Sequence, residues 1–277
     1  MNQKRIQIDT GSSSNFIQLA RQDRKSFHEK YKEILANDYI LYFHQNTLSK
    51  FYKRSYVQEL FQRKDLIRHK ETFYTLDEPA GRKLNDEVPK KLLVIFICIP
   101  DAKRYDSSLI PNRMFPKFFD GIERSLVKNV YTLRIMELNV SHGSHYISTT
   151  IYPEYEEGIQ STILKVMEEF NIYKEHVVLY GGSKGGTGAL IYGIKSELIN
   201  NVFSFVLEIH AVDYIDKKLP DYKKLFSAGD KKIGNYFNSI FFNSDMYNEK
   251  IMRIQTYFYI LVWEMNNLMK HLDLINI

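Results

Sequence analysis

Residues 176–193, His-Val-Val-Leu-Tyr-Gly-Gly-Ser-Lys-Gly-Gly-Thr-Gly-Ala-Leu-Ile-Tyr-Gly, contain the pattern that decides the fold. An apolar run typical of a β-strand, 177–180, meets a glycine-rich turn, and a helical pattern of small and apolar residues follows. Within the turn, residues 181–185 match Gly-x-Ser-x-Gly, the pattern of a nucleophile elbow, in which a serine lies on a sharp turn between a strand and a helix. The pattern therefore predicts Ser183 as a catalytic nucleophile.

The glycines of the turn favour an elbow over a phosphate-binding loop. Gly181 and Gly185 lie two residues before and after the serine, where a Cβ would strike the neighbouring backbone of so tight a turn. A Walker loop is excluded because Lys184 is followed by Gly185 and not by Ser or Thr. A dinucleotide-binding turn is disfavoured because residues 181–186 read Gly-Gly-Ser-Lys-Gly-Gly, without Gly-x-Gly-x-x-Gly.

Composition is that of a globular chain with one large core. The 277 residues are 44% hydrophobic and 14% aromatic, which suits one α/β domain with an appendage. The net charge of +5 gives little support to nucleic-acid binding and is compatible with a polyanionic glycan. The longest apolar run, 92–100, is too short to span a bilayer, and residues 1–10 lack the apolar part of a signal peptide.

The single cysteine, Cys98, cannot form an internal disulfide. We therefore expect a cytoplasmic protein without a transmembrane segment, either free or peripheral to the inner face of the membrane.

Strand and helix patterns alternate after residue 89. The predicted strands are 92–99, 130–138, 176–180 and 202–209, and the predicted helices are 115–128, 155–170 and 184–198. This alternation predicts a doubly wound, mostly parallel sheet with right-handed crossovers. Ser183 then lies at the carboxyl end of a central strand, where such sheets carry their chemistry.

Residues 1–88 are predicted to form a separate, mainly helical N-terminal appendage, and residues 89–277 the core domain. The appendage is expected to hold helices at 16–36 and 48–69, a short strand at 38–43 and a linker at 72–89. Basic and aromatic residues are interleaved in 48–69. This pattern favours an amphipathic helix with a solvated basic face over a binding site for a nucleic acid or glycan.

The elbow Tyr180-Gly-Gly-Ser-Lys-Gly-Gly-Thr-Gly-Ala-Leu is similar to that of bacterial capsular polysaccharide O-acetyltransferases. Residues 92–216 resemble most the XcbB/CpsF family of capsular polysaccharide biosynthesis proteins, and more distantly the accessory secretion proteins that acetylate exported glycoproteins. Ser-Lys-Gly-Gly followed by Gly-Ala-Leu is more specific than a bare Gly-x-Ser-x-Gly.

This resemblance implies an α/β-hydrolase-like fold and a serine-dependent O-acetyltransferase or esterase with a Ser–His–Asp triad. It implies a sugar or polysaccharide acceptor, proteins of a capsule-synthesis complex as partners, no bound cofactor or metal, and an acyl donor such as acetyl-CoA. Two alternatives stay open: a non-catalytic hydrolase-like partner in a polysaccharide synthesis or export complex, and a small-molecule serine hydrolase.

The expected chemistry assigns backbone donors as well as the nucleophile. Ser183 would form an acyl-enzyme that a sugar hydroxyl resolves. The N–H of Lys184 is one expected donor to the oxyanion, and the second should come from the loop after strand 92–99. Because Pro100 has no N–H, Asp101 or Ala102 is expected to supply it.

The remaining triad members are less clear in the sequence. In the order Ser, acid, His, only His210 and His271 follow Ser183, and His210 precedes every obvious acid. We therefore predict His271 as the histidine and Asp245 as the acid, although Asp213 and Asp216 also fit that order. His142 and His145 precede the serine and are expected to line a loop or bind substrate.

The end of the chain departs from the family pattern. After the predicted strand 256–260, family members carry a Gly-Asp-Glu-Gln-like loop with the acid, whereas this chain continues Leu-Val-Trp-Glu-Met-Asn-Asn. Codons can be chosen for 261–272 that encode Gly-Leu-Gly-Asp-Glu-Gln in another frame. We therefore expect a truncated or frameshifted C-terminus, a domain incomplete after about residue 260 and an impaired enzyme, which the nucleotide sequence would test.

Overall fold

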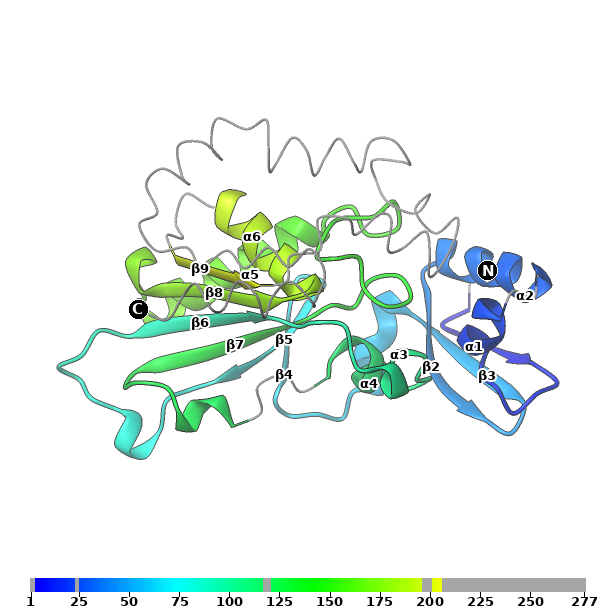
Figure 1. Cartoon of the computed structure of the whole chain (residues 1–277), viewed down its shortest axis with the longest axis horizontal. Coiled ribbons are helices and arrows are strands. Elements are labelled where there is room, and N and C mark those ends of the chain that lie inside the picture. Colours follow the sequence, from blue (N-terminus) through cyan, green and yellow to red (C-terminus); the bar gives the residue numbers. More distant parts are fainter. Residues whose placement is uncertain (1–2, 23–24, 117–120, 196–200, 206–277) are drawn as a thin grey trace, which may run out of the picture.

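The structure is a computed structural model of the chain and describes residues 3–22, 25–116, 121–195 and 201–205. Two sheets organise these residues, a small one formed by the start of the chain and a larger one with helices against it (Figure 1). Among the described residues, none of the helices is both long and apolar enough to cross a bilayer.

The larger sheet has six strands and a mostly parallel core. Its strands are β4 (Leu66–His69), β5 (Thr72–Asp77), β6 (Lys91–Phe96), β7 (Val130–Met136), β8 (Val177–Gly182) and β9 (Asn201–Phe205). Their order is β4-β5-β7-β6-β8-β9. The pairs β7–β6, β6–β8 and β8–β9 are parallel, whereas β4–β5 and β5–β7 are antiparallel. The predicted α/β class with a mostly parallel sheet is confirmed.

Two helices cover one face of this sheet, α5 (Tyr155–Phe170) and α6 (Lys184–Lys195). Their apolar side chains form one core with every second residue of β6, β7 and β8, because successive side chains of a strand point to opposite faces. Shorter helical segments lie between these elements: α3 (Ala102–Tyr105), α4 (Ile110–Met114) and the 3-10 turns η2 (Gly81–Lys83), η3 (Ile122–Arg124) and η4 (Lys174–His176).

The N-terminal unit is an antiparallel sheet with two helices packed on it. Its elements are β1 (Arg5–Asp9), α1 (Phe16–Arg21), α2 (Lys25–Ala36), β2 (Tyr39–Gln45), β3 (Leu48–Lys53) and the 3-10 turn η1 (Arg54–Leu60). The strand order is β1-β3-β2. Aromatic rings of Phe16, Tyr31 and Phe51 meet in its core, with centroids 5.5–6.4 Å apart.

Several predictions for the first 88 residues are wrong. The predicted helix 48–69 is instead β3, η1 and β4, and the predicted linker 72–89 contains β5. The predicted helix 16–36 is two helices, α1 and α2. These residues hold five strands, β1 to β5, beside the helices α1 and α2, so they mix strand and helix where a mainly helical appendage is expected.

The physical reason is long-range pairing. β3 pairs with β1 on one side and β2 on the other, and β5 pairs with β7, more than fifty residues away. The β4–β5 hairpin turns through Lys70 (φ 52°), where the sequence has no glycine or asparagine to signal it. β4 and β5 come from residues 66–77, so the six-stranded sheet extends across the predicted boundary at residue 88.

The core-domain elements agree better with the predictions. α5 has the predicted bounds 155–170, and β6, β7 and β8 lie within about three residues of the predicted strands. The predicted helix 115–128 is wrong, since α4 ends at Met114 and residues 122–124 form only a 3-10 turn.

Candidate active site

Ser183 lies at the junction of β8 and α6, at the carboxyl end of a strand that β6 and β9 flank in the larger sheet. Its φ is +52°, a left-handed conformation that non-glycine residues adopt rarely. Its carbonyl accepts the N–H groups of Gly186 at 2.9 Å and Thr187 at 3.3 Å, which closes the first turn of α6. Strand, strained serine and helix are thus arranged as in a nucleophile elbow.

The two glycines that flank the serine are packed against backbone. A Cβ on Gly181 would lie 2.1 Å from the carbonyl oxygen of Gly185, and a Cβ on Gly185 would lie 2.1 Å from the carbonyl oxygen of Phe96. Real Cβ contacts do not reach such distances. The start of α6 therefore approaches both β8 and the end of β6 so closely that only glycine fits at these two positions.

The side chain of Lys184 points into the protein and not into a site. Lys184 is 2% exposed, and its Nζ donates to the carbonyl oxygen of His142 at 3.0 Å and pairs with the carboxylate of Glu137, which is 0% exposed. A buried ion pair of this kind fixes the geometry of the segments that carry it, and removing one partner leaves an uncompensated charge. The predicted role of Lys184 concerns its backbone N–H, which this arrangement holds in the first turn of α6.

The loop after β7, residues 137–150, is fastened to the elbow. Glu137 Oε1 accepts the N–H of Ser144 at 2.6 Å and of Tyr146 at 2.8 Å. Val140, His145 and Tyr146 have positive φ values of 45°, 55° and 64°. A β-branched residue such as valine is a clear outlier in that region, so the loop is held in a strained path by its contacts.

Asp101 and Ala102 lie at the start of α3 and are exposed. The Asp101 carboxylate caps this helix, accepting the N–H groups of Lys103 at 3.0 Å and Arg104 at 3.1 Å. The predicted role of either backbone N–H in an oxyanion hole stays a prediction.

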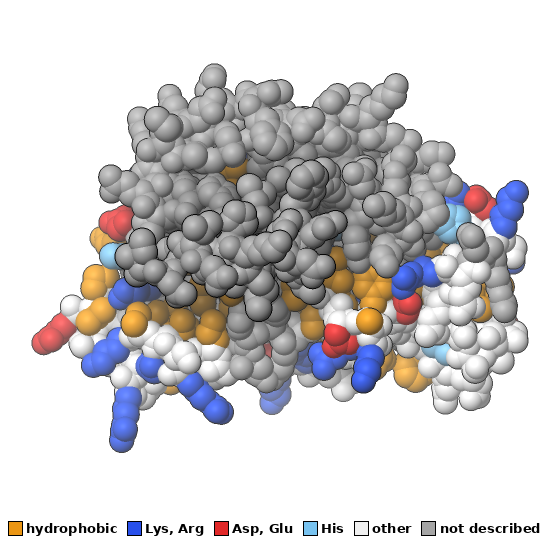
Figure 2. Space-filling view, viewed as in Figure 1, with side chains coloured by type: hydrophobic (Ala, Val, Ile, Leu, Met, Phe, Trp, Pro, Cys, Tyr) orange, Lys and Arg blue, Asp and Glu red, His pale blue; other side chains and the backbone are white. Residues whose placement is uncertain are grey.

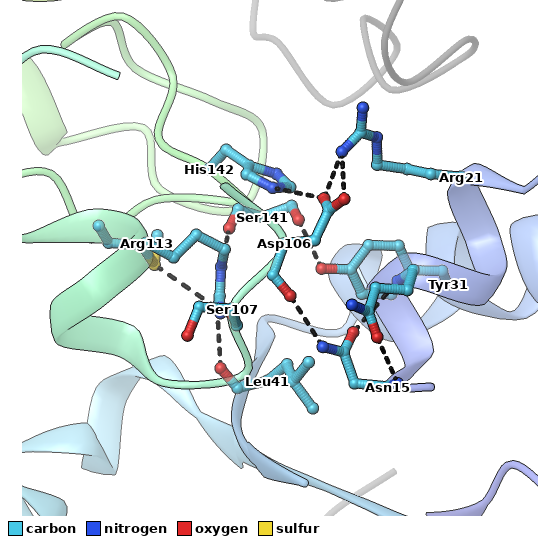
Figure 3. A network of polar contacts seen from close by, with 11 residues as sticks. Asn15, Arg21, Tyr31, Leu41, Asp106, Ser107, Arg113, Ser141 and His142 are labelled. Atoms are coloured by element: carbon cyan, nitrogen blue, oxygen red, sulfur yellow. Dashed lines mark hydrogen bonds and ion pairs between the residues drawn. The ribbon is translucent and has the colours of Figure 1, made fainter. Parts of the chain in front are cut away.

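A polar network ties the N-terminal unit to the loops after β6 and β7 (Figure 3). Asp106 forms an ion pair with Arg21 of α1, and its backbone carbonyl accepts the Asn15 side chain at 2.8 Å. The hydroxyl groups of Tyr31 in α2 and Ser141 lie 2.5 Å apart. The N-terminal unit thus supports the loops beside the elbow.

Arg113 is the centre of this network. Its guanidinium is 0% exposed and donates to three backbone carbonyls, those of Ser141 at 2.7 Å, Leu41 at 2.8 Å and Ser107. Burial lowers the pKa of Arg113. Arg113 is not predicted from the sequence. Its partners are backbone carbonyls of three distant segments, and a backbone carbonyl gives no sequence pattern.

His142 is held beside the elbow by its backbone and its ring. Its carbonyl accepts from Lys184, its ring stacks on Tyr105 with centroids 4.2 Å apart, and its Nε2 lies 3.8 Å from an oxygen of Asp106. Burial lowers the pKa of His142 to about 4. The nearby Asp106 carboxylate raises this pKa, but by less than burial lowers it. Burial by itself would raise the pKa of Asp106, but His142 and Arg21 outweigh it and lower that pKa.

The imidazole of His142 is therefore neutral at pH 7, able both to donate and to accept a hydrogen bond. His145, also in this loop, is buried.

The predicted acid and histidine, Asp245 and His271, lie outside the described residues, as does His210. Among the residues that the structure describes, no group of three or more potential ligands could hold a metal ion. A cavity of about 470 Å³ lies at the amino ends of β6 and β7, against Lys91, Val130 and His176. Because Ser183 lies at the opposite end of the sheet, this cavity is separate from the candidate site.

Figure 2 shows lysine and arginine side chains along the lower edge and at both ends of the visible face.

Comparison with known proteins gives weak similarities only. No family model matches the chain, and no curated protein matches it. The capsule O-acetyltransferase of Neisseria meningitidis serogroup A is 14% identical, with 76% of this chain and 92% of that chain covered and a TM-score of 0.47. The serine hydrolase FphF of Staphylococcus aureus is 16% identical, with 78% and 84% covered and a TM-score of 0.46.

The glycosylation-associated Gap123 complex of Streptococcus agalactiae is 15% identical, with 83% and 42% covered and a TM-score of 0.46. At such TM-scores these likenesses carry no argument, and the fold rests on the sheet and the elbow described above.

Proposed function

We propose that this chain is a serine-dependent O-acyltransferase or esterase that carries an acyl group on Ser183 and acts on a capsular or other surface polysaccharide. The observation that carries the proposal is the backbone of Ser183, a non-glycine residue at φ 52° between β8 and α6. Strain of this kind costs on the order of 1–3 kcal/mol, and it is found most often where chemistry requires it. The glycan substrate rests on the resemblance of the elbow sequence alone.

In the proposed reaction, Ser183 Oγ attacks the carbonyl carbon of an acyl donor such as acetyl-CoA. The serine proton passes to a histidine and then to the leaving group, so that acyl-Ser183 and the free thiol form. A sugar hydroxyl, or water in an esterase, attacks the acyl carbonyl carbon, and its proton passes through the histidine to the Ser183 oxygen. The acyl–oxygen bond to Ser183 breaks, which releases the sugar ester, or the free carboxylic acid, and the serine. His271 is the proposed histidine and Asp245 its acid partner.

The developing oxyanion is proposed to bind two backbone donors. Lys184 is the first residue of α6, where N–H groups have no acceptor within the helix and the helix dipole favours negative charge. Asp101 or Ala102 is proposed as the second donor. Each such donor lowers the barrier by about 3–4 kcal/mol in well-studied enzymes.

The proposal is tested with the full-length chain, p-nitrophenyl acetate or acetyl-CoA as donor, and de-O-acetylated capsular polysaccharide as acceptor. Acetyl groups on the glycan support a transferase, and free acetate supports an esterase, provided that Ser183→Ala abolishes either product. Product formation that is the same in wild type and Ser183→Ala would contradict the proposal.

A further inference from the structure

The backbone just beyond β6 is held by a tyrosine side chain. β6 ends at Phe96, the last residue that pairs with β7 and β8, and the next residue is Ile97. The Ile97 N–H donates to the hydroxyl oxygen of Tyr146 at 2.5 Å, and that hydroxyl donates to the Ile97 carbonyl at 3.0 Å. The Tyr146 hydroxyl thus bonds to both the N–H and the carbonyl of Ile97, at the point where strand pairing stops.

Tyr146 is itself fixed from three sides. Its N–H donates to Glu137 at 2.8 Å, and its carbonyl accepts the hydroxyl of Tyr192 in α6 at 2.8 Å. Its ring lies so close to α6 that a Cβ on Gly188 would come within 2.6 Å of it. The ring also meets Phe96 edge-on, with centroids 5.0 Å apart.

The hydroxyl of Tyr146 stays a donor throughout the working range of pH. Tyr146 is fully buried, and burial, with a smaller contribution from the Glu137 charge, raises its pKa well above the usual value. The ring is placed with a positive backbone φ of 64°, a strained conformation for tyrosine. The surrounding contacts therefore hold Tyr146 in a backbone conformation that tyrosine otherwise disfavours. Strained residues of this kind cluster at functional sites.

The hydrogen bonds between Tyr146 and Ile97 lie at the junction of α6 and β6, which an oxyanion hole requires. The Phe96 carbonyl also contacts Gly185, the residue after Lys184, so the start of α6 and the end of β6 meet here. In hydrolases with this elbow, one oxyanion donor follows the nucleophile and the other comes from the loop after the neighbouring strand. In this chain that loop begins at Ile97.

We infer that Tyr146 is a positioning residue that sets the loop after β6, and thereby the second oxyanion donor, relative to the N–H of Lys184. The inference rests on the proposed function of Ser183. Tyr146 does not touch the reacting atoms in this account; it acts through the backbone of Ile97.

The experiment compares three full-length chains: wild type, Tyr146→Phe and, as the matched control, Tyr155→Phe. Tyr155 is equally buried in the same core, but its hydroxyl makes only a 3.4 Å contact with the Met136 carbonyl. Four quantities are measured: hydrogen exchange of the Ile97 amide, kcat and KM for p-nitrophenyl acetate, and inhibition by a trifluoromethyl ketone, which forms a tetrahedral adduct with the serine.

Tyr146→Phe is expected to speed exchange of the Ile97 amide and to lower kcat about 10- to 100-fold, somewhat less than the loss of a whole oxyanion donor. KM should stay within about twofold, and the ketone should bind more weakly by a factor similar to the fall in kcat, because both depend on the oxyanion donors. Tyr155→Phe should stay within about twofold of wild type in every quantity.

A fall in kcat that is equal in both variants, or a rise in KM with kcat unchanged, overturns the inference while the proposed function stands. A wild-type chain without Ser183-dependent turnover overturns the proposed function and this inference with it. If Tyr146→Phe does not fold, Tyr192→Phe decides, since it removes the bond from the Tyr192 hydroxyl to the Tyr146 carbonyl. It should give the same pattern with a smaller fall in kcat, and an unchanged kcat overturns the inference.

Discussion

Gly185, the second residue of α6, lies against the carbonyl of Phe96, the last residue of β6, with no room for a side chain between them. The same contact brings the helix that follows Ser183 next to the loop that follows β6. A nucleophile elbow needs this close approach, because its two oxyanion donors come from these two segments.

Gly185→Ala should therefore be severely destabilising. A Cβ would lie 2.1 Å from the Phe96 oxygen, and relieving that overlap requires the backbone to move, so we expect a loss of about 3 kcal/mol. Gly81→Ala is the control: Gly81 has φ 55° with open space around its Cβ, and only the left-handed backbone should cost about 1 kcal/mol. Urea unfolding measures both losses, and a Gly185→Ala loss no larger than that of Gly81→Ala would speak against the close approach.

The buried ion pair of Glu137 and Lys184 should show strong coupling. Glu137→Gln and Lys184→Met should each cost about 3–5 kcal/mol, because each leaves one charge in the interior without its partner. The double variant should cost less than the sum of the single changes by at least about 1 kcal/mol. Additive losses in the free energy of unfolding would mean that the two charges do not interact.

His142 should make stability depend on pH between about 4 and 6.5. Its folded pKa is lowered to about 4 by burial, so in this range the unfolded chain binds more protons than the folded one. The contribution of His142 to the free energy of unfolding is complete above about pH 6.5. It is lost as the pH falls towards 4, a change of about 3 kcal/mol. The pKa of the neighbouring Asp106 is lowered, so its carboxylate stays charged over most of this range.

His142→Gln removes the titrating group, so its free energy of unfolding should fall less steeply over the same range. Unfolding curves at several pH values provide the comparison. Equal slopes for wild type and variant would show that His142 is not buried in the neutral form.

Arg113→Lys should loosen the contact between the N-terminal unit and the loops beside the elbow. Lysine keeps the charge but cannot donate to the carbonyls of Ser141, Leu41 and Ser107 together, so we expect a loss of about 3 kcal/mol and faster proteolysis. Arg63→Lys is the matched control, because Arg63 forms a surface pair with Asp65 that should contribute less than about 1 kcal/mol. Equal stabilities of the two variants would refute the role given to Arg113.

The sequence predicts the central strands and the elbow because their signals are local. β6 and β8 are short apolar runs, α5 has a clear helical spacing of apolar residues, and the glycines around Ser183 mark a turn that other residues do not fit. Of the N-terminal strands, only the short one predicted at 38–43 is confirmed, by β2; the others have no local signal because pairing decides them, and β3 is central only because β1 and β2 flank it.

The same distinction holds for the candidate site. Ser183 was found from a five-residue motif, whereas Tyr146 and Arg113 act on backbone groups of Ile97 and Ser141, which carry no side-chain signal. A pattern search finds residues that do chemistry more readily than residues that hold distant backbone segments in place.

The central claim is that Ser183 is a nucleophile, and covalent labelling with a fluorophosphonate followed by peptide mass spectrometry tests it most directly. Ser161 provides the control, because its hydroxyl lies 2.6 Å from His69 Nε2 but on a helix without an elbow. We expect an adduct on Ser183 in wild type and in Ser161→Ala, and none in Ser183→Ala. An unlabelled wild-type chain, or an adduct that persists in Ser183→Ala, would contradict this claim.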